Sequence, residues 1–357
     1  MKENPFFIYY PYLLKTVQIL KDRRQKHTMR FRTLRESFYT KLWTETAHQV
    51  GADIQDIGYG FYKIQVGGRA TYVHNSMVML DNHLTLKIAG NKPLVSSLFS
   101  KSEYHYPTAK FIEYDLTNLQ KAYNFLQEIK KPGVVKPADA GSGGQGITTG
   151  IDSWTRLKKA SFNASIFGQR LLLEEQIEGH SFRLLYLNGQ YLDAVRREPP
   201  QVLGDGKRSI KMLIEDENIK RVSAHKPRSL HPLTIDLDSK YFLHSQGYGV
   251  NAVLPEKKRI PVKRVVNQNS CYENESVTSI VHPGIIEMGA QMTRLFGVQL
   301  AGVDIITPDI TRPLVEAGGI MGELNTTPGL HHHYFISNEM EITPVALHIL
   351  KFLLKLS

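Results

Sequence analysis

The sequence predicts an α+β protein in which a small mixed domain precedes a larger one, and three features carry that prediction. Helix-like and strand-like patterns alternate along the chain without any repeat. Asn188-Gly189 separates two strand-like runs, which is the strongest short signal for a β-hairpin. A glycine-rich loop at residues 141–146 joins two further strand-like runs instead of leading into a helix.

The composition is that of a globular protein of two to three domains. The chain has 357 residues, of which 41% are hydrophobic and 22% charged, and a domain averages roughly 150 residues. Its single cysteine, Cys271, excludes an internal disulfide and a cysteine-only metal cage. No apolar run approaches the roughly 20 residues that span a bilayer. We therefore expect a cytoplasmic protein without a membrane segment.

The first 86 residues are predicted to form a separate mixed domain that binds a substrate or a partner. A basic segment at residues 21–35 precedes a helical pattern through Phe38 and Trp43, which Gly51 closes. Two strand-like runs follow at residues 60–66 and 70–80. The chain carries 44 Lys and Arg against 34 Asp and Glu, a net charge of +10, which favours anionic partners.

Two interpretations of the basic segment remain open. The favoured one is a solvated helix face, or a surface that attracts an acidic substrate or partner protein. The other is a helix that engages nucleic acid.

The remaining elements follow from periodicity and from Gly and Pro positions. A strand at residues 133–136, the loop at 137–146 and a strand at 147–150 form a strand–glycine loop–strand unit. Helices are predicted at residues 92–99, 116–129, 154–167, 209–217, 285–296 and 344–356, and the other strands at 170–177, 181–187, 190–197, 298–307 and 319–325.

The glycine loop matches G-x-G-x-x-G, but the match does not predict a dinucleotide site. Such a site needs a helix N-terminus after the loop, and here a strand-like run follows. A glycine loop between strands can still cover phosphates, because its backbone N–H groups approach them closely. Lys136, just before the loop, would add a positive charge. A plain surface hairpin with a solvated lysine is the alternative.

Three oxygen-bearing side chains are predicted to converge near the C-terminus. Glu323 and Asn325 lie two apart on a predicted strand and therefore share a face. Asp304 lies on a neighbouring predicted strand. All-oxygen ligation by few protein groups suits Mg²⁺ when nucleotide phosphates complete the coordination. An exposed, alternating strand face is the alternative.

Together these segments resemble the ATP-grasp superfamily, and within it the ligase domains of cyanophycin synthetases and bifunctional glutathione-synthesising enzymes. The resemblance covers about residues 87–357. The matching segments are VVKPADAGSGGQGI, LLLEEQIEGHSFRLL, AVRREPPQVLGDGKRSIKMLIEDEN, VHPGIIEMGAQMTRLFGVQLAGVDII and GELNTTPGL. It implies an ATP-grasp fold of two α+β subdomains that grip ATP, a lid at about 104–187 and a metal and substrate subdomain at about 188–357.

The resemblance also implies a role for each matching residue. Arg197 and Arg264 look like the arginines that steady the transferred phosphoryl group. The implied nucleotide contacts are the two lysines Lys92 and Lys136, the flap residues Gly141, Ser142, Gly143, Gly144 and Gly146, and the adenine-binding residues Glu174, Glu175 and Ile177. The implied ligands of Mg²⁺, with Mn²⁺ as an alternative ion, are Asp304, Glu323 and Asn325.

These roles imply an ATP-dependent carboxylate–amine ligase that forms an amide or peptide bond through an acyl phosphate. Its partners would be small acids and amines, namely amino acids or peptides, with the acceptor either free or bound to a carrier. A homo-oligomer is left open. The rival hypothesis is a nucleotide-fold binding or regulatory protein whose basic N-terminal segment engages nucleic acid or an acidic partner protein.

Overall fold

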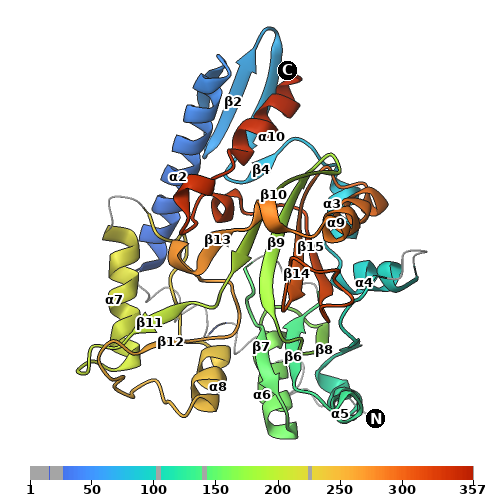
Figure 1. Ribbon diagram of the computed structural model, residues 1–357, viewed down its shortest axis with the longest axis vertical. Coiled ribbons are helices and arrows are strands. Elements are labelled where there is room, and N and C mark those ends of the chain that lie inside the picture. The colour runs from blue at the N-terminus through green and yellow to red at the C-terminus, as the bar shows by residue number, and fades with distance from the viewer. Residues whose placement is uncertain (1–15, 17–26, 102–105, 139–142, 224–226, 357) are drawn as a thin grey trace.

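A computed structural model describes Thr16 and residues 27–101, 106–138, 143–223 and 227–356. In this part of the chain the strands form a five-stranded sheet, two four-stranded sheets and a two-stranded ribbon (Figure 1). Every strand pair is antiparallel. The α+β class predicted from the sequence is confirmed.

The five-stranded sheet occupies the centre of the molecule, with the strand order β13-β10-β9-β14-β15. Its β9–β10 hairpin turns at Asn188 and Gly189, whose φ angles of 50° and 74° are both positive. A two-residue hairpin turn of type I′ requires this conformation at both positions. The strands are β9 (His180–Leu187), β10 (Gln190–Arg197), β13 (Asn274–Ser276), β14 (Leu300–Thr307) and β15 (Ile320–Asn325).

One face of this sheet carries a large apolar cluster. Phe182, Leu184 and Ala194 point to this face and belong to one buried cluster with residues of the covering helices. Successive side chains of a strand alternate between faces, so the intervening residues point the other way. The covering helices are α3 (His83–Ala89), α4 (Lys92–Lys101) and α9 (Pro283–Phe296).

The opposite face is apolar at one end only. There Leu185, Leu187 and Leu300 pack with α2 (His27–Gln49) and α10 (Val345–Leu354). Figure 1 shows α2 and α10 side by side, next to the N-terminal sheet. That sheet contains β1 (Asp53–Gly58), β2 (Phe61–Val66), β3 (Arg69–His74) and β4 (Met77–Val78).

The helix expected to end near Gly51 is therefore confirmed as α2. It includes the second half of the basic segment, and residues 21–26 lie outside the described part of the chain. The expected division at residue 86 falls within α3, and α2 shares its core with the C-terminal α10. Independent folding of residues 1–86 stays a prediction.

The other four-stranded sheet, with the order β5-β8-β6-β7, lies below the central sheet in Figure 1. Strands β6 and β7 pair on either side of the glycine loop, as expected. The lid expected at residues 104–187 extends beyond this sheet, because its last residues form β9 of the central sheet. The elements are β5 (Phe111–Tyr114), β6 (Gly133–Pro137), β7 (Thr148–Ile151), β8 (Leu171–Glu175), α5 (Leu119–Ile129) and α6 (Trp154–Ser165).

A separate small core joins α7 (Ile210–Ser223), α8 (Leu237–Ser245) and the ribbon of β11 (Gln201–Leu203) and β12 (Arg259–Pro261). Helix α7 is longer than expected, and α8 was not predicted because nine residues show little periodicity. The start of α8 is capped by Asp236, which accepts a hydrogen bond from the backbone N–H of Ser239.

Short 3₁₀ helices complete the described elements: η1 (Leu116–Asn118), η2 (Cys271–Glu273), η3 (Thr278–Ile280), η4 (Leu330–His333) and η5 (Glu339–Glu341). The helices expected at 92–99, 116–129, 154–167, 285–296 and 344–356 are confirmed, with ends that differ by a residue or two or by a 3₁₀ turn. Within the described residues, no helix combines the length and apolar character that crossing a membrane demands.

Candidate active site

A pocket lies where the sheet β5-β8-β6-β7, which we call the small sheet, meets the central sheet. Lys136 of β6 and Glu174 of β8 approach it from one side, and Glu323 of β15 and Lys92 of α4 from the other. The sequence thus predicted four residues that the fold brings together. The remaining lining residues are Ala89, Val95, Ser96, Gly322 and Leu324.

The four charged side chains form one ion-pair network. Lys136 Nζ lies 2.7 Å from Glu174 Oε1 and 3.3 Å from Glu323 Oε1, and Lys92 Nζ lies 2.9 Å from the same Glu323 oxygen. Burial by itself lowers the pKa of Lys136, but Glu174 and Glu323 outweigh burial and raise it. Burial likewise raises the pKa of Glu323, and the two lysines lower it further than burial raises it. Both groups are therefore charged at neutral pH.

The two adjacent acids of β8 point in opposite directions, because strand residues alternate. Glu174 faces the pocket and Lys136, whereas Glu175 Oε1 accepts a hydrogen bond from the backbone N–H of Lys110 at 3.0 Å. Ile177 follows the strand. The adenine-binding role of this segment stays a prediction, and the geometry assigns Glu174 to the lysine network.

The three predicted metal ligands share one face of the central sheet. Asn325 pairs in register with Gly302, two residues before Asp304. Asn325 Nδ2 donates a hydrogen bond of 3.1 Å to Asp304 Oδ2. Gly322 allows the close approach of the two strands, since a Cβ there would lie 3.1 Å from the Asp304 carbonyl oxygen.

This donor set fits a magnesium ion. Two carboxylates and one amide offer hard oxygen atoms, and Mg²⁺ takes few protein ligands when phosphates and water supply the rest. In the described part of the chain, no three or more His, Cys, Asp or Glu side chains are grouped so that they could bind a metal ion. The predicted trio contains two carboxylates, so any ion bound there would need other ligands as well.

Arg183 is a site residue that the sequence reasoning missed. It pairs in register with Asp304 on the neighbouring strand, and its Nε and a terminal nitrogen each donate a 2.7 Å hydrogen bond to one carboxylate oxygen. Burial lowers the pKa of Arg183, but Asp304 more than offsets this and raises it. An arginine inside the otherwise apolar stretch 182–187 was the signal that could have identified it.

The two predicted catalytic arginines occupy different environments. Arg197, the last residue of β10, is buried and donates a 2.5 Å hydrogen bond to the Val266 carbonyl oxygen. Burial, and then the neighbouring Arg183, lower the pKa of Arg197 to about 9. Arg264 is half exposed and donates 3.0 Å hydrogen bonds to both carboxylate oxygens of Glu178. The structure therefore places Arg197, but not Arg264, beside the Asp304 network.

The described end of the glycine loop is anchored across the site. Gly143, Gly144 and Gly146 have φ angles of 94°, 66° and 77°, which L-residues rarely adopt. Asn267 Nδ2 donates a 2.8 Å hydrogen bond to the Gly143 carbonyl oxygen. The predicted flap residues Gly141 and Ser142 lie outside the described residues.

Known proteins resemble this chain in sequence. It is 28% identical over 276 residues to cyanophycin synthetase of Trichormus variabilis, covering 76% of this chain and 30% of that protein. It is 27% identical over 311 residues to the glutathione biosynthesis bifunctional protein GshAB of Streptococcus agalactiae, covering 85% and 41%. The chain thus spans well under half the length of these relatives. No known family profile matches it.

A solved structure shares the arrangement of the elements. The bifunctional glutathione synthetase from Pasteurella multocida superposes with a TM-score of 0.52 at 20% identity, over 85% of this chain and 41% of that one. This chain has the ATP-grasp fold. It resembles ATP-grasp superfamily ligases in sequence as well, as its motifs implied. The pocket of Lys136 and Glu323 lies between β6 of the sheet β5-β8-β6-β7 and β15 of the central sheet.

Proposed function

We propose that the chain is an ATP-dependent carboxylate–amine ligase that forms an amide or peptide bond and releases ADP and phosphate. The strongest support is that Lys136 of the small sheet meets Glu323 of the central sheet at one pocket, with Asp304 in the adjoining network. Cations for phosphate oxygens and oxygen ligands for a divalent ion then lie in a single site, as phosphoryl transfer requires.

In this mechanism an oxygen of the acid substrate attacks the γ-phosphorus of ATP, and ADP leaves. The amine then attacks the acyl carbon of the acyl phosphate, phosphate leaves, and the amine loses a proton. Lys92 and Lys136 exchange their carboxylate partners for phosphate oxygens, which releases Glu323. A bound Mg²⁺ would be held by Asp304, Glu323 and Asn325 and would offset negative charge on the phosphates.

Arg197 has the chemistry of a group that steadies the transferred phosphoryl. It is buried, charged at neutral pH and has no carboxylate within 4 Å among the described residues. Arg264 could take the same role after leaving Glu178. Positioning and charge therefore carry the catalysis in this proposal, which needs no nucleophilic side chain.

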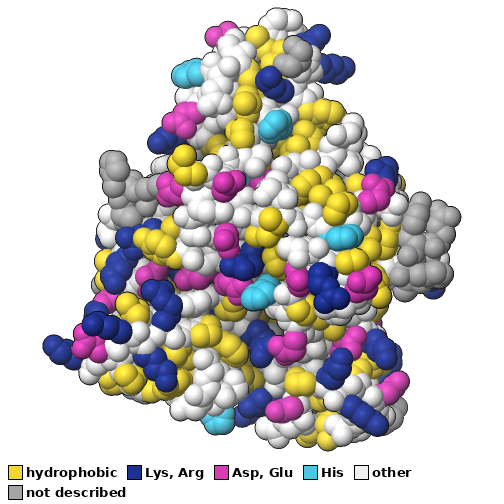
Figure 2. Space-filling model, viewed as in Figure 1, with side chains coloured by type: hydrophobic (Ala, Val, Ile, Leu, Met, Phe, Trp, Pro, Cys, Tyr) yellow, Lys and Arg dark blue, Asp and Glu magenta, His cyan; other side chains and the backbone are white. Residues whose placement is uncertain are grey.

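The substrates that we propose are amino acids or peptides, with an acceptor amine that is free or carrier-bound. The rival function, a regulatory protein that binds nucleic acid through its basic segment, is not favoured. Arg32 pairs with Glu36 along α2, and Arg35 turns inward to His231. On the face seen in Figure 2, Lys and Arg side chains are interleaved with Asp and Glu.

Trapping with hydroxylamine tests the proposal without knowledge of the amine. The protein is incubated with ATP, Mg²⁺, hydroxylamine and a panel of amino acids and peptides. An acyl phosphate would give a hydroxamate and ADP in equal amounts. Asp304→Asn and Glu323→Gln should lose most of both products, whereas Glu316→Gln, an exposed acid paired with Arg312, should not. ATP binding without ADP formation from any acid would instead favour a binding protein.

A further inference from the structure

An antiparallel ribbon lies beside α7 and includes the strands β11 and β12. We call it the basic ribbon and define it as residues 201–212 and 250–261. Leu203 pairs in register with Arg259, and an isolated bridge and several backbone hydrogen bonds continue the pairing towards α7. The two segments therefore form one continuous surface.

The basic ribbon carries a large share of the charge of the chain. Its residues include six basic and two acidic ones, a net charge of +4, against +10 for all 357 residues. Arg208 is paired with Asp205 and Asp216. Among the described residues, no carboxylate lies within 4 Å of the other five basic side chains, all of them exposed: Lys207, Lys211, Lys257, Lys258 and Arg259. The ribbon thus presents positive charge without a counterion.

Apolar side chains lie among these charges. Leu203, Met212 and Val253 are about half exposed, at 49%, 52% and 50% of their surface. The inward-pointing side chains of the ribbon, such as Val202 and Ile260, instead belong to the small buried core beneath it. Figure 2 shows hydrophobic side chains next to Lys and Arg at the left edge, where Figure 1 draws α7 and the ribbon. The outer face therefore offers apolar contacts as well as positive charge.

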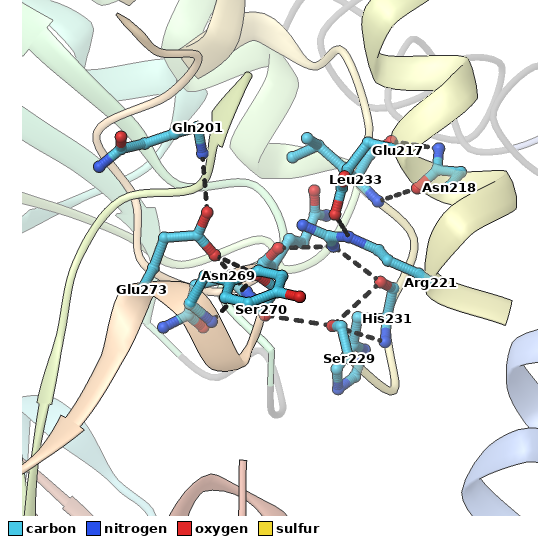
Figure 3. Close-up of polar contacts among 12 residues, drawn as sticks. Gln201, Glu217, Asn218, Arg221, Ser229, His231, Leu233, Asn269, Ser270 and Glu273 are labelled. Atoms are coloured by element: carbon cyan, nitrogen blue, oxygen red, sulfur yellow. Dashed lines mark hydrogen bonds and ion pairs between the residues drawn. The ribbon is translucent and has the colours of Figure 1, made fainter. Parts of the chain in front are cut away.

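The helix beside the ribbon is firmly held, as Figure 3 shows. The fully buried Arg221 of α7 donates a hydrogen bond of 3.0 Å to the His231 carbonyl. Asn218 of α7 donates a hydrogen bond of 2.9 Å to the Leu233 carbonyl and accepts one of 2.7 Å from the Leu233 N–H. Because α7 is fixed in this way, a partner would meet a preformed surface, which lowers the entropy cost of binding.

Both strands of the ribbon lead directly to the active site. Leu203 of β11 follows Arg197 by six residues, so at most about 21 Å separates their Cα atoms. The segment after β12 contains Arg264 and then Asn267, which donates the hydrogen bond to the glycine loop. A group attached to a molecule on the ribbon can therefore reach the active site through a short, extended chain.

We propose that the basic ribbon binds an acidic polypeptide that carries one of the two ligase substrates, the acid or the amine, and thereby delivers it to the active site. The inference rests on the proposed ligase function and deepens it, since it selects a carrier-bound substrate over a free one. Complementary charge attracts the partner and orients it on the surface. A polypeptide fits better than a nucleic acid, because a phosphate backbone has no apolar side chains to contact Leu203, Met212 and Val253.

Synthetic peptides test the proposal in an assay of ADP release. Each peptide has a six-residue stretch of alternating Glu and Leu, a Gly/Ser spacer, and a terminal amino acid that supports ADP release in its free form. That amino acid stands at the carboxyl end to test a tethered acid and at the amino end to test a tethered amine. The spacer has either eight residues, which span up to about 28 Å, or two, which span about 7 Å.

With the eight-residue spacer, the wild-type protein should have a KM at least tenfold lower for the Glu peptide than for the same peptide with Gln in place of Glu. Docking raises the effective concentration of the tethered amino acid at the active site only when the spacer can reach it. The two-residue spacer should therefore give no difference between the Glu and Gln peptides.

Charge reversal on the ribbon should abolish the tenfold difference and leave the KM values for ATP and for the free amino acid unchanged. The variant combines Lys257→Glu, Lys258→Glu and Arg259→Glu, none of which is part of the proposed catalytic site. The control reverses three exposed lysines outside the ribbon, Lys131→Glu, Lys158→Glu and Lys159→Glu, and should keep the difference.

Equal KM values for the Glu and Gln peptides in the wild-type protein, or the same difference after charge reversal, would overturn the inference. Absence of ADP release from every acid would overturn the ligase function instead. Binding of the fluorescently labelled Glu peptide then tests the ribbon by itself, and binding that weakens with salt and is lost on charge reversal would support it. No binding, or tighter binding of a single-stranded oligonucleotide or of vesicles that contain anionic lipid, would refute an acidic polypeptide as the partner.

Discussion

Arg183 and Asp304 face each other on β9 and β14 and are joined by two parallel hydrogen bonds of 2.7 Å. The pair fixes the plane of a carboxylate that we propose as a metal ligand. The second oxygen of Asp304 also accepts from Asn325, so three strands of the central sheet hold the predicted metal ligands in one arrangement. Support of this kind around a ligand tunes both its orientation and its affinity for the ion.

We expect Arg183→Lys to lower turnover at least tenfold and to raise the Mg²⁺ concentration needed for half-maximal rate. Lysine keeps the charge but cannot hold both carboxylate oxygens at once. The rate of ADP release at varied Mg²⁺ measures both effects. Arg196→Lys, which changes the neighbouring arginine of β10 that pairs with Glu275, is the control and should leave both values unchanged. A normal magnesium dependence in Arg183→Lys would remove Arg183 from the metal site.

Lys136→Ala should weaken ATP binding by about tenfold or more, since a charge-assisted contact contributes about 1.5 to 3 kcal/mol. It should also destabilise the ATP-free protein, because Glu174 and Glu323 lose the cation between them. Nucleotide titration and urea unfolding measure the two effects. Lys158→Ala, which removes an exposed lysine of α6, serves as the control. An unchanged ATP dissociation constant would mean that Lys136 acts only within the ion-pair network.

Arg264 gives a sharper test because its partner can be changed separately. If Arg264 contacts the transferred phosphoryl group, Arg264→Lys should lower kcat at least tenfold, about 1.4 kcal/mol of transition-state stabilisation, while ATP affinity stays the same. Glu178→Gln, which removes its exposed carboxylate partner, should not lower kcat. Wild-type kcat in Arg264→Lys would leave the role to Arg197.

The buried histidines predict a loss of stability on mild acidification. The pKa values of His231, His331 and His332 are all lowered, by burial first, so these rings stay neutral in the folded protein while the unfolded chain takes up protons below about pH 6.5. The free energy of unfolding should therefore fall between pH 6.5 and 5, by up to about 1.4 kcal/mol per pH unit for each ring.

Urea unfolding at pH 7.5, 6.5, 5.5 and 5.0 checks this prediction. Carboxylates with a lowered pKa, such as Asp193, lose their contribution only below the unfolded value of about 4, so they do not contribute in this window. His231→Asn should reduce the slope with pH, and His83→Asn, which changes an exposed histidine of α3, should not. An identical slope in His231→Asn would show that this ring does not titrate on unfolding.

Helices, strands and turns were predicted from local sequence wherever the pattern that identifies them lies within a few neighbouring residues. The turn at Asn188-Gly189 requires positive φ, and the two-residue spacing of Glu323 and Asn325 fixes their common face. Local patterns did not identify short elements that span few turns or alternations, such as α8 and the strands β5 and β13. A pattern of period 3.6 or 2 needs several turns or alternations before it becomes distinct.

By itself, the sequence determined the α+β class, the order of the main helices and strands, and the four charged residues that line the pocket: Lys92, Lys136, Glu174 and Glu323. The tertiary structure alone decided which residues meet. Strand register set Arg183 against Asp304, and the packing of α2 on the leucines of β9 brought Arg35 to His231, 196 residues away in the chain. Such contacts depend on register and burial across the whole core, which no local pattern encodes.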